Sequence, residues 1–137
     1  MKILVAYDGS TAGRRALDWA ARLAKDDADS SVHVIGVAAT LEAAPRIADA
    51  VDPGSSVEMH RRDLADAAST LAAAGVRADT TLKVGNPAEE IIEAGDEGAY
   101  DLIVMGSTGA GRAVRFLLGS VSDRVVRHAN RPVMVVR

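Results

Sequence analysis

The sequence predicts an α/β fold, a doubly wound five-stranded parallel sheet with helices on both faces. Five apolar runs recur along the 137 residues. Most of them are continuous rather than alternating, which is typical of strands that are buried on both faces in parallel sheets. Segments with helical periodicity separate the runs, as βαβ crossovers require. Because apolar residues make up 48% of the chain, we expect one domain, residues 1–137, with a sizeable core.

The apolar runs give the expected strands. These are Ile3–Tyr7, Val32–Val37, Val76–Val84, Leu102–Met105 and Val133–Val136. The third run, VRADTTLKV, alternates in part, whereas the others are nearly continuous. Partial alternation indicates a strand nearer an edge of the sheet, where one side of the strand is less covered.

Helices are expected in the first two gaps between strands. The first helix has Ser10 or Thr11 as N-cap, and the second ends at Gly75. Each carries apolar residues at helical spacing. These stripes are Ala16, Leu17, Ala20, Leu23 and Ala24 in the first helix, and Val57, His60, Leu64, Ala67, Leu71 and Ala74 in the second.

Two shorter helices are expected in the remaining gaps. The third follows Asn86 as N-cap, with Pro87 at the first helical position and two glutamates in the first turn. The fourth ends near Asn130 and Pro132. Its stripe consists of Val121, Val125, His128 and Ala129.

Composition and charge argue against several classes of protein. The net charge is −3, whereas a protein that coats nucleic acid needs a basic surface. The chain has no cysteine, so disulfides and thiolate metal sites are excluded, and its three histidines lack metal-ligand spacing. The start MKILVAYDG does not resemble a signal peptide, and no segment approaches the roughly 20 apolar residues of a membrane helix. We therefore expect a cytoplasmic protein without nucleic-acid or membrane partners.

A glycine-rich segment, GSTGAGRAVRFLLGS, follows the fourth apolar run. In open α/β sheets, ligands bind beyond the carboxyl ends of the strands, where the strand order reverses. Two segments suit that edge, the Tyr7–Thr11 turn after the first strand and the glycine segment after the fourth.

Two standard phosphate-binding motifs do not fit the glycine segment. Gly106 and Gly111 have the Walker spacing, but Arg112 and Ala113 replace the lysine and the hydroxyl residue that this mechanism needs. A dinucleotide fingerprint beginning at Gly109 has Val114 in place of its third glycine. Both motifs are therefore rejected.

What remains is Gly106-x-x-Gly109, nine residues, and then Gly119-Ser120 at the start of the last helix. Glycines let the backbone approach an anion without obstruction by a Cβ atom. Gly119, Ser120 and Val121 are expected to present free amides at a helix N-terminus, which favours negative charge. Two further side chains of the segment, Arg112 and Arg115, could face phosphates or water.

With this pattern the chain resembles the universal stress protein family over its whole length, from KILVAYDGS through GNPAEEI to PVMVV. The ATP-binding branch of that family carries the motif G-2x-G-9x-G-[ST], which Gly106, Gly109, Gly119 and Ser120 match. The resemblance implies the Rossmann-like fold of the adenine nucleotide alpha-hydrolase type. It also implies ATP, AMP or another adenine nucleotide as ligand.

The resemblance further implies contacts to the nucleoside. Asp8 would contact the nucleotide near its ribose or a metal, and the backbone of Val37 would meet the adenine. Met105 and Gly106 would line the same crevice. Ala6 takes a position where some members of the family place a proline that lines the pocket. Without the resemblance, Asp8 can also be interpreted as a carboxylate that caps a helix or a turn.

At the other end of the ligand, the resemblance implies that Gly109, Gly119, Ser120 and Val121 hold the ribose and phosphates. The protein alone is expected to bind no metal, although Mg²⁺ could arrive with the nucleotide near Asp8. The last strand, Val133–Val136, would lie at a sheet edge and pair with its counterpart in a homodimer. An uncovered apolar edge is an aggregation hazard, so pairing of this kind also makes physical sense.

Three functions remain open at this stage. The favoured one is a regulatory or stress-response protein that acts through nucleotide binding and dimerisation. The second is a slow ATPase or a nucleotide-dependent enzyme. It is less favoured because the Walker lysine is missing and Asp8 is the one plausible general base, so no catalytic residue is assigned. The third is a structural dimer that has kept the fold without the ligand.

Overall fold

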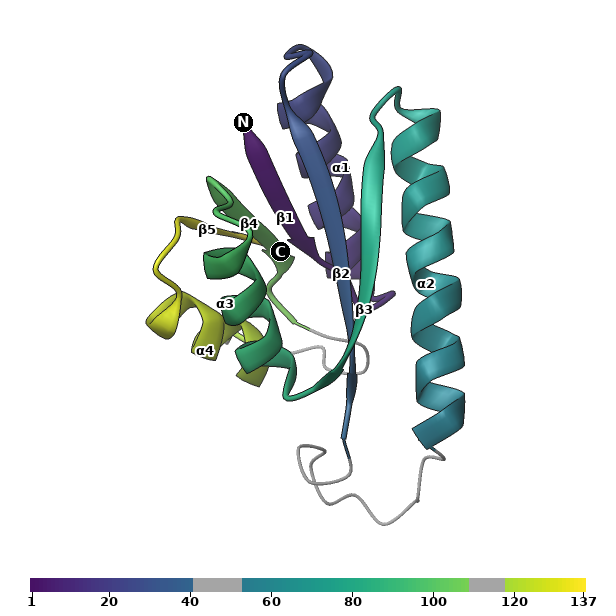
Figure 1. The fold of residues 1–137 in the computed structure, drawn as a ribbon, viewed down its shortest axis with the longest axis vertical. Coiled ribbons are helices and arrows are strands. Elements are labelled where there is room, and N and C mark those ends of the chain that lie inside the picture. Colours follow the sequence, from purple (N-terminus) through teal and green to yellow (C-terminus); the bar gives the residue numbers. More distant parts are fainter. Residues whose placement is uncertain (41–52, 109–117) are drawn as a thin grey trace.

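The structure is a computed structural model of the chain, and it describes residues 1–40, 53–108 and 118–137. Strands and helices alternate along these residues (Figure 1). The elements are β1 (Lys2–Ala6), α1 (Thr11–Lys25), β2 (Ser31–Ala39), α2 (Pro53–Ala73), β3 (Ala78–Gly85), α3 (Pro87–Glu97), β4 (Leu102–Gly106), α4 (Ser120–His128) and β5 (Val133–Val136). The five strands form one parallel sheet in the order β3-β2-β1-β4-β5, which confirms the predicted fold class.

The strand order reverses between β1 and β4. From β1 the chain adds β2 and β3 on one side, and β4 and β5 then extend the sheet on the other. The central strand therefore has two neighbours, with Ile3 opposite Val32 of β2 and Leu102 of β4. This reversal leaves a crevice at the carboxyl ends of β1 and β4, because the helices that follow them leave toward opposite faces.

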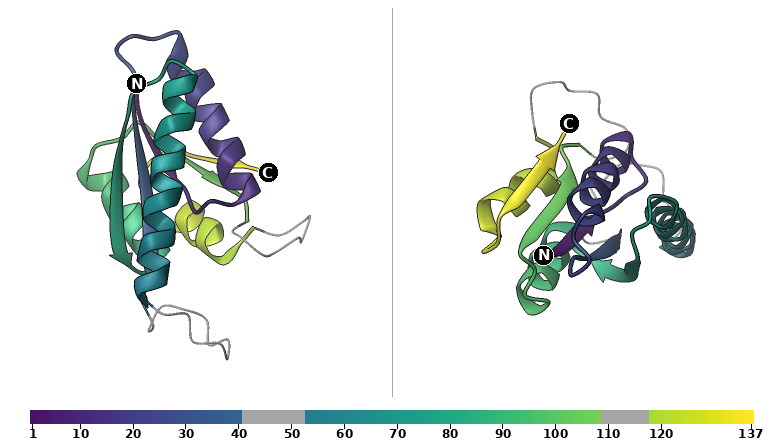
Figure 2. Two further views of the ribbon diagram at one scale, coloured as in Figure 1. Left: turned by 90° about the vertical axis from the view of Figure 1, so that its right-hand side faces the viewer. Right: turned by 90° about the horizontal axis from the view of Figure 1, so that it is seen from above.

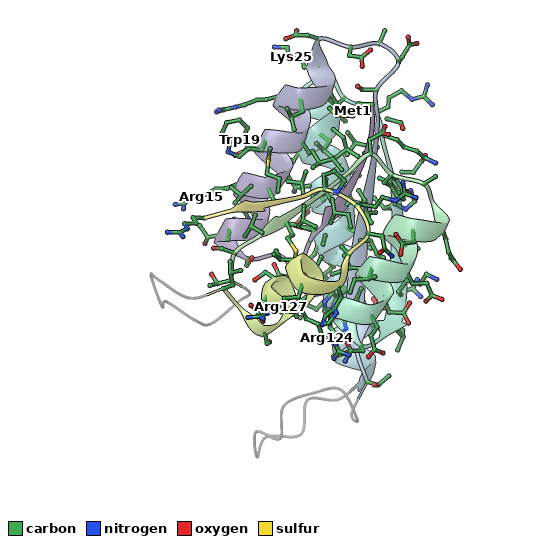
Figure 3. All side chains as sticks on the ribbon, turned by 90° about the vertical axis from the view of Figure 1, so that its left-hand side faces the viewer. Met1, Arg15, Trp19, Lys25, Arg124 and Arg127 are labelled. Carbon is green, nitrogen blue, oxygen red and sulfur yellow. The ribbon has the colours of Figure 1, made fainter. Side chains whose placement is uncertain are left out.

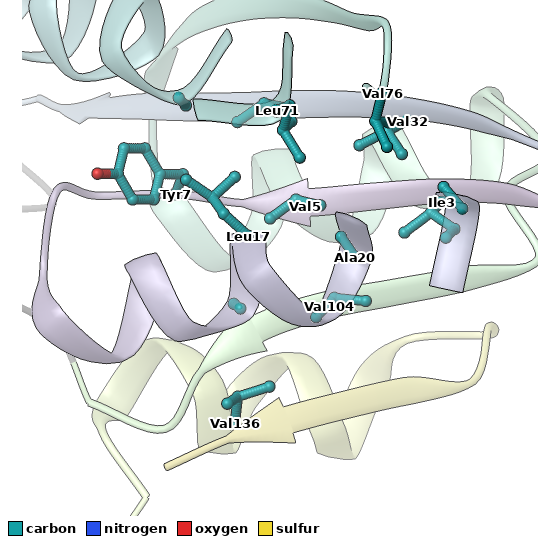
Figure 4. Close-up of a cluster of buried hydrophobic side chains, with 14 of the residues drawn as sticks. Ile3, Val5, Tyr7, Leu17, Ala20, Val32, Leu71, Val76, Val104 and Val136 are labelled. Carbon is teal, nitrogen blue, oxygen red and sulfur yellow. The ribbon is translucent and has the colours of Figure 1, made fainter. Parts of the chain in front are cut away.

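Helices cover both faces of the sheet, as predicted. Helices α1 and α2 lie on one face and α3 and α4 on the other (Figure 2). Alternate residues of β1 point to the two sides, so that Ile3 and Val5 join the first core cluster and Leu4 joins the second. Leu17 and Leu71 bring α1 and α2 onto the first cluster (Figure 4). Strands buried on both sides explain the continuous apolar runs of the sequence.

The predicted caps are confirmed. Ser10 Oγ accepts a hydrogen bond of 3.0 Å from the Gly13 amide at the start of α1. Asn86 Oδ1 accepts one of 3.3 Å from the Glu89 amide at the start of α3. Such side-chain caps satisfy amides that have no partner within the helix.

Four of the five predicted strands differ from the structure by one or two residues at their ends, and the largest differences are in β2 and β3. β3 lies at an edge of the sheet as expected, but it begins at Ala78 rather than Val76. Val76 is buried in the first core cluster, and its amide donates to Leu71 O of α2, so this residue closes the helix instead of pairing with β2. β2 continues to Ala39 because β3 still pairs with it there, opposite Gly85.

The outer face of α1 carries a tryptophan. Trp19 is 44% exposed, and the Arg22 guanidinium lies 5.3 Å from the centre of its ring. One turn earlier, the Arg15 guanidinium donates a 3.0 Å hydrogen bond to the backbone carbonyl of Arg137, just beyond β5 (Figure 3). This hydrogen bond connects α1 to the backbone just after β5, at the edge of the sheet.

Candidate functional site

A cavity of about 460 Å³ opens at the carboxyl ends of β1, β2 and β4, where the strand order reverses. All of the expected site residues that the structure describes line this cavity. They are Ala6, Asp8, Val37, Met105, Gly106, Gly119, Ser120 and Val121. The fold thus brings together residues that are far apart in the sequence. Of the remaining candidates, Gly109, Arg112 and Arg115 lie outside the described residues.

Apolar side chains form one wall of the cavity. Ala6, Val37 and Met105 lie at or near the carboxyl ends of three adjacent strands and are nearly inaccessible to solvent. Ile35 of β2 and Ile91 of α3 continue the same wall. A wall of this kind can cover a flat apolar or aromatic group, while polar groups elsewhere in the cavity fix its orientation.

The turn after β1 contributes a carboxylate. Asp8 is exposed and lines the cavity, and its Oδ1 accepts a 3.0 Å hydrogen bond from the Ser10 amide. Gly9 follows with φ of 77°, in the left-handed region that glycine adopts without strain. Asp8 therefore stabilises its own turn, and its second oxygen is still available for a ligand. The two interpretations of Asp8 left open by the sequence are thus compatible.

The N-terminus of α4 presents backbone amides to the cavity. The Asp123 amide makes the first helical hydrogen bond, to Gly119 O at 2.9 Å. The amides of Ser120, Val121 and Ser122 therefore have no partner within the helix. The helix dipole adds to their attraction for an anion.

The expectation that the Gly119 amide is free was wrong. This amide donates a 2.7 Å hydrogen bond to Ser107 O, just after β4. The backbone of Gly119 has φ of −64°, an ordinary value for an N-cap. Gly119 therefore joins the two ends of the glycine segment, and the amides available to a ligand begin at Ser120.

Ser122 reinforces this connection. Its side chain is 2% exposed, and Oγ lies 2.7 Å from Ser107 O and 3.0 Å from Gly119 O. The single hydroxyl proton is therefore shared between carbonyls on both sides of the segment, with Ser107 O as the nearer acceptor. Ser122 was not among the site residues predicted from the sequence. A serine two residues beyond the motif is a weak signal, because exposed serines are common near helix starts.

Gly106 has a packing role. A Cβ atom at this position would lie 2.8 Å from the backbone carbon and the Cβ of Ala12 and from the Gly13 amide nitrogen. Real Cβ atoms do not come this close to backbone atoms. The glycine at the end of β4 therefore allows α1 to begin directly against the strand, which brings the Asp8 turn near the glycine segment.

Residues from α2 also line the cavity. Ser56 and His60 belong to this helix, and His60 was predicted as part of its apolar stripe rather than as a site residue. Their position depends on how α2 packs against the rest of the fold, which local sequence does not reveal. A histidine in an apolar stripe was the one available signal.

The described residues contain neither a candidate membrane helix nor a candidate metal cluster. No helix among them is long and apolar enough to cross a membrane. Within residues 1–40, 53–108 and 118–137, no group of three or more His, Cys, Asp or Glu side chains is placed to hold a metal ion.

Comparisons with known proteins agree with this architecture. Universal stress protein YxiE from Bacillus subtilis is 34% identical over 145 residues, which cover 99% of this chain and 98% of that protein. A universal stress protein from Archaeoglobus fulgidus, solved in complex with dAMP, superimposes with a TM-score of 0.75 at 27% identity, covering 100% of this chain and 98% of the other. A universal stress protein solved in complex with cAMP gives a TM-score of 0.76 at 26% identity, with coverage of 100% and 97%.

The sequence also matches the model of a protein family along its length. The match extends over residues 1–137, and the description of that family is "Universal stress protein family". Together with the shared five-stranded fold, this match assigns the protein: the chain belongs to the universal stress protein family.

Proposed function

We propose that this protein binds an adenine nucleotide, ATP or AMP, in the cavity at the reversal point of its sheet. The observation that carries the proposal is the convergence of two different surfaces on one cavity. The apolar ends of β1, β2 and β4 suit a purine base, and the amides of Ser120, Val121 and Ser122 suit phosphates. A volume of about 460 Å³ falls in the range of small-molecule sites.

Two relatives support the choice of an adenine ligand, since they were solved with dAMP and with cAMP. In this chain the backbone of Val37, near the carboxyl end of β2, would meet the base. Asp8 would contact the ribose or Mg²⁺ carried by a triphosphate. Gly109, Arg112 and Arg115 stay candidates for the phosphate end of the site.

The proposal includes a homodimer formed through β5. This strand ends the sheet, and β4 accompanies it on one side. The amides of Ile103 in β4 and of Ser107, just after β4, donate to the carbonyls of Pro132 and Val136. In a parallel ladder successive residues point to alternate sides, so the backbone groups of Val133 and Val135 are directed to the other side of β5. A second copy related by a two-fold axis would pair with them in antiparallel fashion.

The proposed role is regulatory. Nucleotide binding in the cavity and dimerisation through β5 would together create a surface that a partner recognises in a stress response. Residues 1–137 would act as one domain, in the cytoplasm. ATP hydrolysis would be slow at most, because Asp8 already holds its own turn and no lysine follows the glycine segment in the Walker position.

Mass spectrometry of freshly purified protein, denatured to release bound ligand, tests this function. We expect an adenine nucleotide in an amount that approaches one per chain. Calorimetry on nucleotide-free protein should then give saturable binding of ATP or AMP and weaker binding of GTP. Absence of both released nucleotide and calorimetric binding would leave the third possibility, a dimer that retains the fold without the ligand.

A further inference from the structure

His60 is a polar side chain of α2 that lines the cavity together with Asp8. It is partly buried, and it reaches the cavity from the helix that covers the α1 side of the sheet. The nucleotide-binding role proposed above does not assign any part to this residue.

The packing of α2 places His60 beside the turn that holds Asp8. A Cβ atom at Gly9 would lie 2.8 Å from both carboxylate oxygens of Asp63. Asp63 is three residues after His60 and therefore lies on the same side of the helix. The side chain of Tyr7, and to a smaller extent the charges of Asp66 and Asp63, raise the pKa of Arg14, which agrees with the packing of α2 beside α1. This turn of α2 thus rests against the Asp8–Gly9 turn.

The hydrogen bonding of His60 determines what its ring offers to the cavity. Nδ1 lies 2.8 Å from the backbone carbonyl of Ser56. Because a carbonyl oxygen can only accept, Nδ1 carries the proton and donates. In the neutral ring Nε2 is then an acceptor, and it points away from that carbonyl. Among the described residues, no hydrogen bond to Nε2 is present.

The cavity is therefore lined by two side chains that each offer an acceptor, the second oxygen of Asp8 and Nε2 of His60, from a turn and a helix that pack against each other. Neither suits a phosphate, since Asp8 is anionic and a neutral imidazole nitrogen repels other acceptors. The part of a nucleotide that offers two adjacent donors is the ribose, through its 2′ and 3′ hydroxyls. We propose that His60 accepts a hydrogen bond from one of these hydroxyls and makes the site selective for ribonucleotides. This inference rests on the proposed nucleotide-binding function.

Calorimetry with three ligands, AMP, 2′-deoxy-AMP and 3′-deoxy-AMP, tests the inference on nucleotide-free protein. We expect the wild type to bind each deoxy analogue about tenfold more weakly than AMP, the loss of one hydrogen bond. His60→Ala should weaken AMP binding by about the same factor and abolish the discrimination against one analogue. His60→Gln, whose amide reaches the position of Nε2, should retain most of that discrimination. Met59→Ala, at a neighbouring position that is 52% exposed, is the matched control and should behave as the wild type.

The outcomes separate the two proposals. Failure of AMP to bind the wild type overturns both the nucleotide function and the role of His60. If AMP binds but His60→Ala keeps the wild-type ratios between AMP and both analogues, the role of His60 alone is overturned. A His60→Ala variant that weakens all three ligands equally also overturns it, because a residue that merely shapes the cavity would have that effect.

Discussion

The Ser122 hydroxyl donates a 2.7 Å hydrogen bond to the carbonyl of Ser107, and so joins the start of α4 to the end of β4. The same carbonyl accepts a 2.7 Å hydrogen bond from the Gly119 amide. Ser107 and Ser122 are both buried, so these contacts are shielded from water. They hold the N-terminus of α4 in the position from which its amides face the cavity.

Ser122→Ala should therefore lower both stability and ligand affinity. One donor to Ser107 O is lost while the Gly119 amide remains, so we expect the free energy of unfolding to fall by about 1 kcal/mol. Nucleotide affinity should fall severalfold as the helix start loosens. Urea denaturation and calorimetry measure the two effects. Ser69→Ala, at an exposed position of α2, should change neither. An unaltered affinity in Ser122→Ala would show that the hydrogen bond does not position the amides.

Gly106→Ala should destabilise the fold through the contact between β4 and α1. The added Cβ would lie 2.8 Å from backbone atoms of Ala12 and Gly13, which cannot yield as a flexible side chain would. Overpacking of this kind costs about 1–3 kcal/mol. Gly119→Ser is a suitable comparison in denaturant unfolding. The φ angle of Gly119 is −64°, and an added Cβ would have its nearest neighbour at 3.3 Å. Serine is also a favoured residue at the N-cap position. Equal unfolding midpoints for Gly106→Ala and wild type would contradict the packing role of Gly106.

Asp8→Asn should separate the two roles of Asp8. The amide oxygen can still accept from the Ser10 amide, so the melting temperature without ligand should stay close to that of the wild type. At about 100 times the dissociation constant, ATP should stabilise the wild type by about 2.7 kcal/mol, and the same ATP concentration should stabilise Asp8→Asn less. Asp8→Ala should lose stability as well, because it removes the turn contact.

Thermal unfolding with ATP and with GTP provides the measurement for both variants, and GTP should give a smaller shift in the wild type. Phosphate release in the presence of Mg²⁺ should stay far below the roughly 10 s⁻¹ typical of enzymes. Equal shifts with ATP and GTP would argue against an adenine site. Turnover near one per second that Asp8→Asn abolishes would favour the enzyme instead.

Val135→Pro should dissociate the proposed dimer. Proline removes an amide that points to the free side of β5 and leaves the hydrogen bonds from Ile103 and Ser107 to β5 in place. Light scattering at tens of micromolar should give a dimer for the wild type and a monomer for the variant. Val126→Asp, on an α4 side chain that is 45% exposed, should stay dimeric. A monomeric wild type, or a dimeric Val135→Pro, would contradict pairing through β5.

The sequence by itself determined the elements of this protein and the family to which it belongs. Strands buried on both faces need continuous apolar runs, and amphipathic helices need a periodic stripe of apolar residues. Both patterns can be recognised within a short segment of the sequence. The caps at Ser10 and Asn86 are local as well, because each bonds an amide three residues away. The glycine spacing marked the edge of the sheet where the cavity lies, since glycine is required where backbones approach closely.

Tertiary packing decided the remaining features. Three of these features join segments that are distant in the chain. Ala12 packs closely against Gly106, and the Gly119 amide donates to the carbonyl of Ser107. His60 lines the same cavity as the Asp8 turn. Local sequence constrains φ, ψ and the direction of a side chain on its own element. It does not specify the relative placement of two helices across a sheet, which depends on how the side chains of both core clusters fit together. The identity of the amides and side chains that face the cavity therefore emerged only when α2 and α4 were packed onto the sheet.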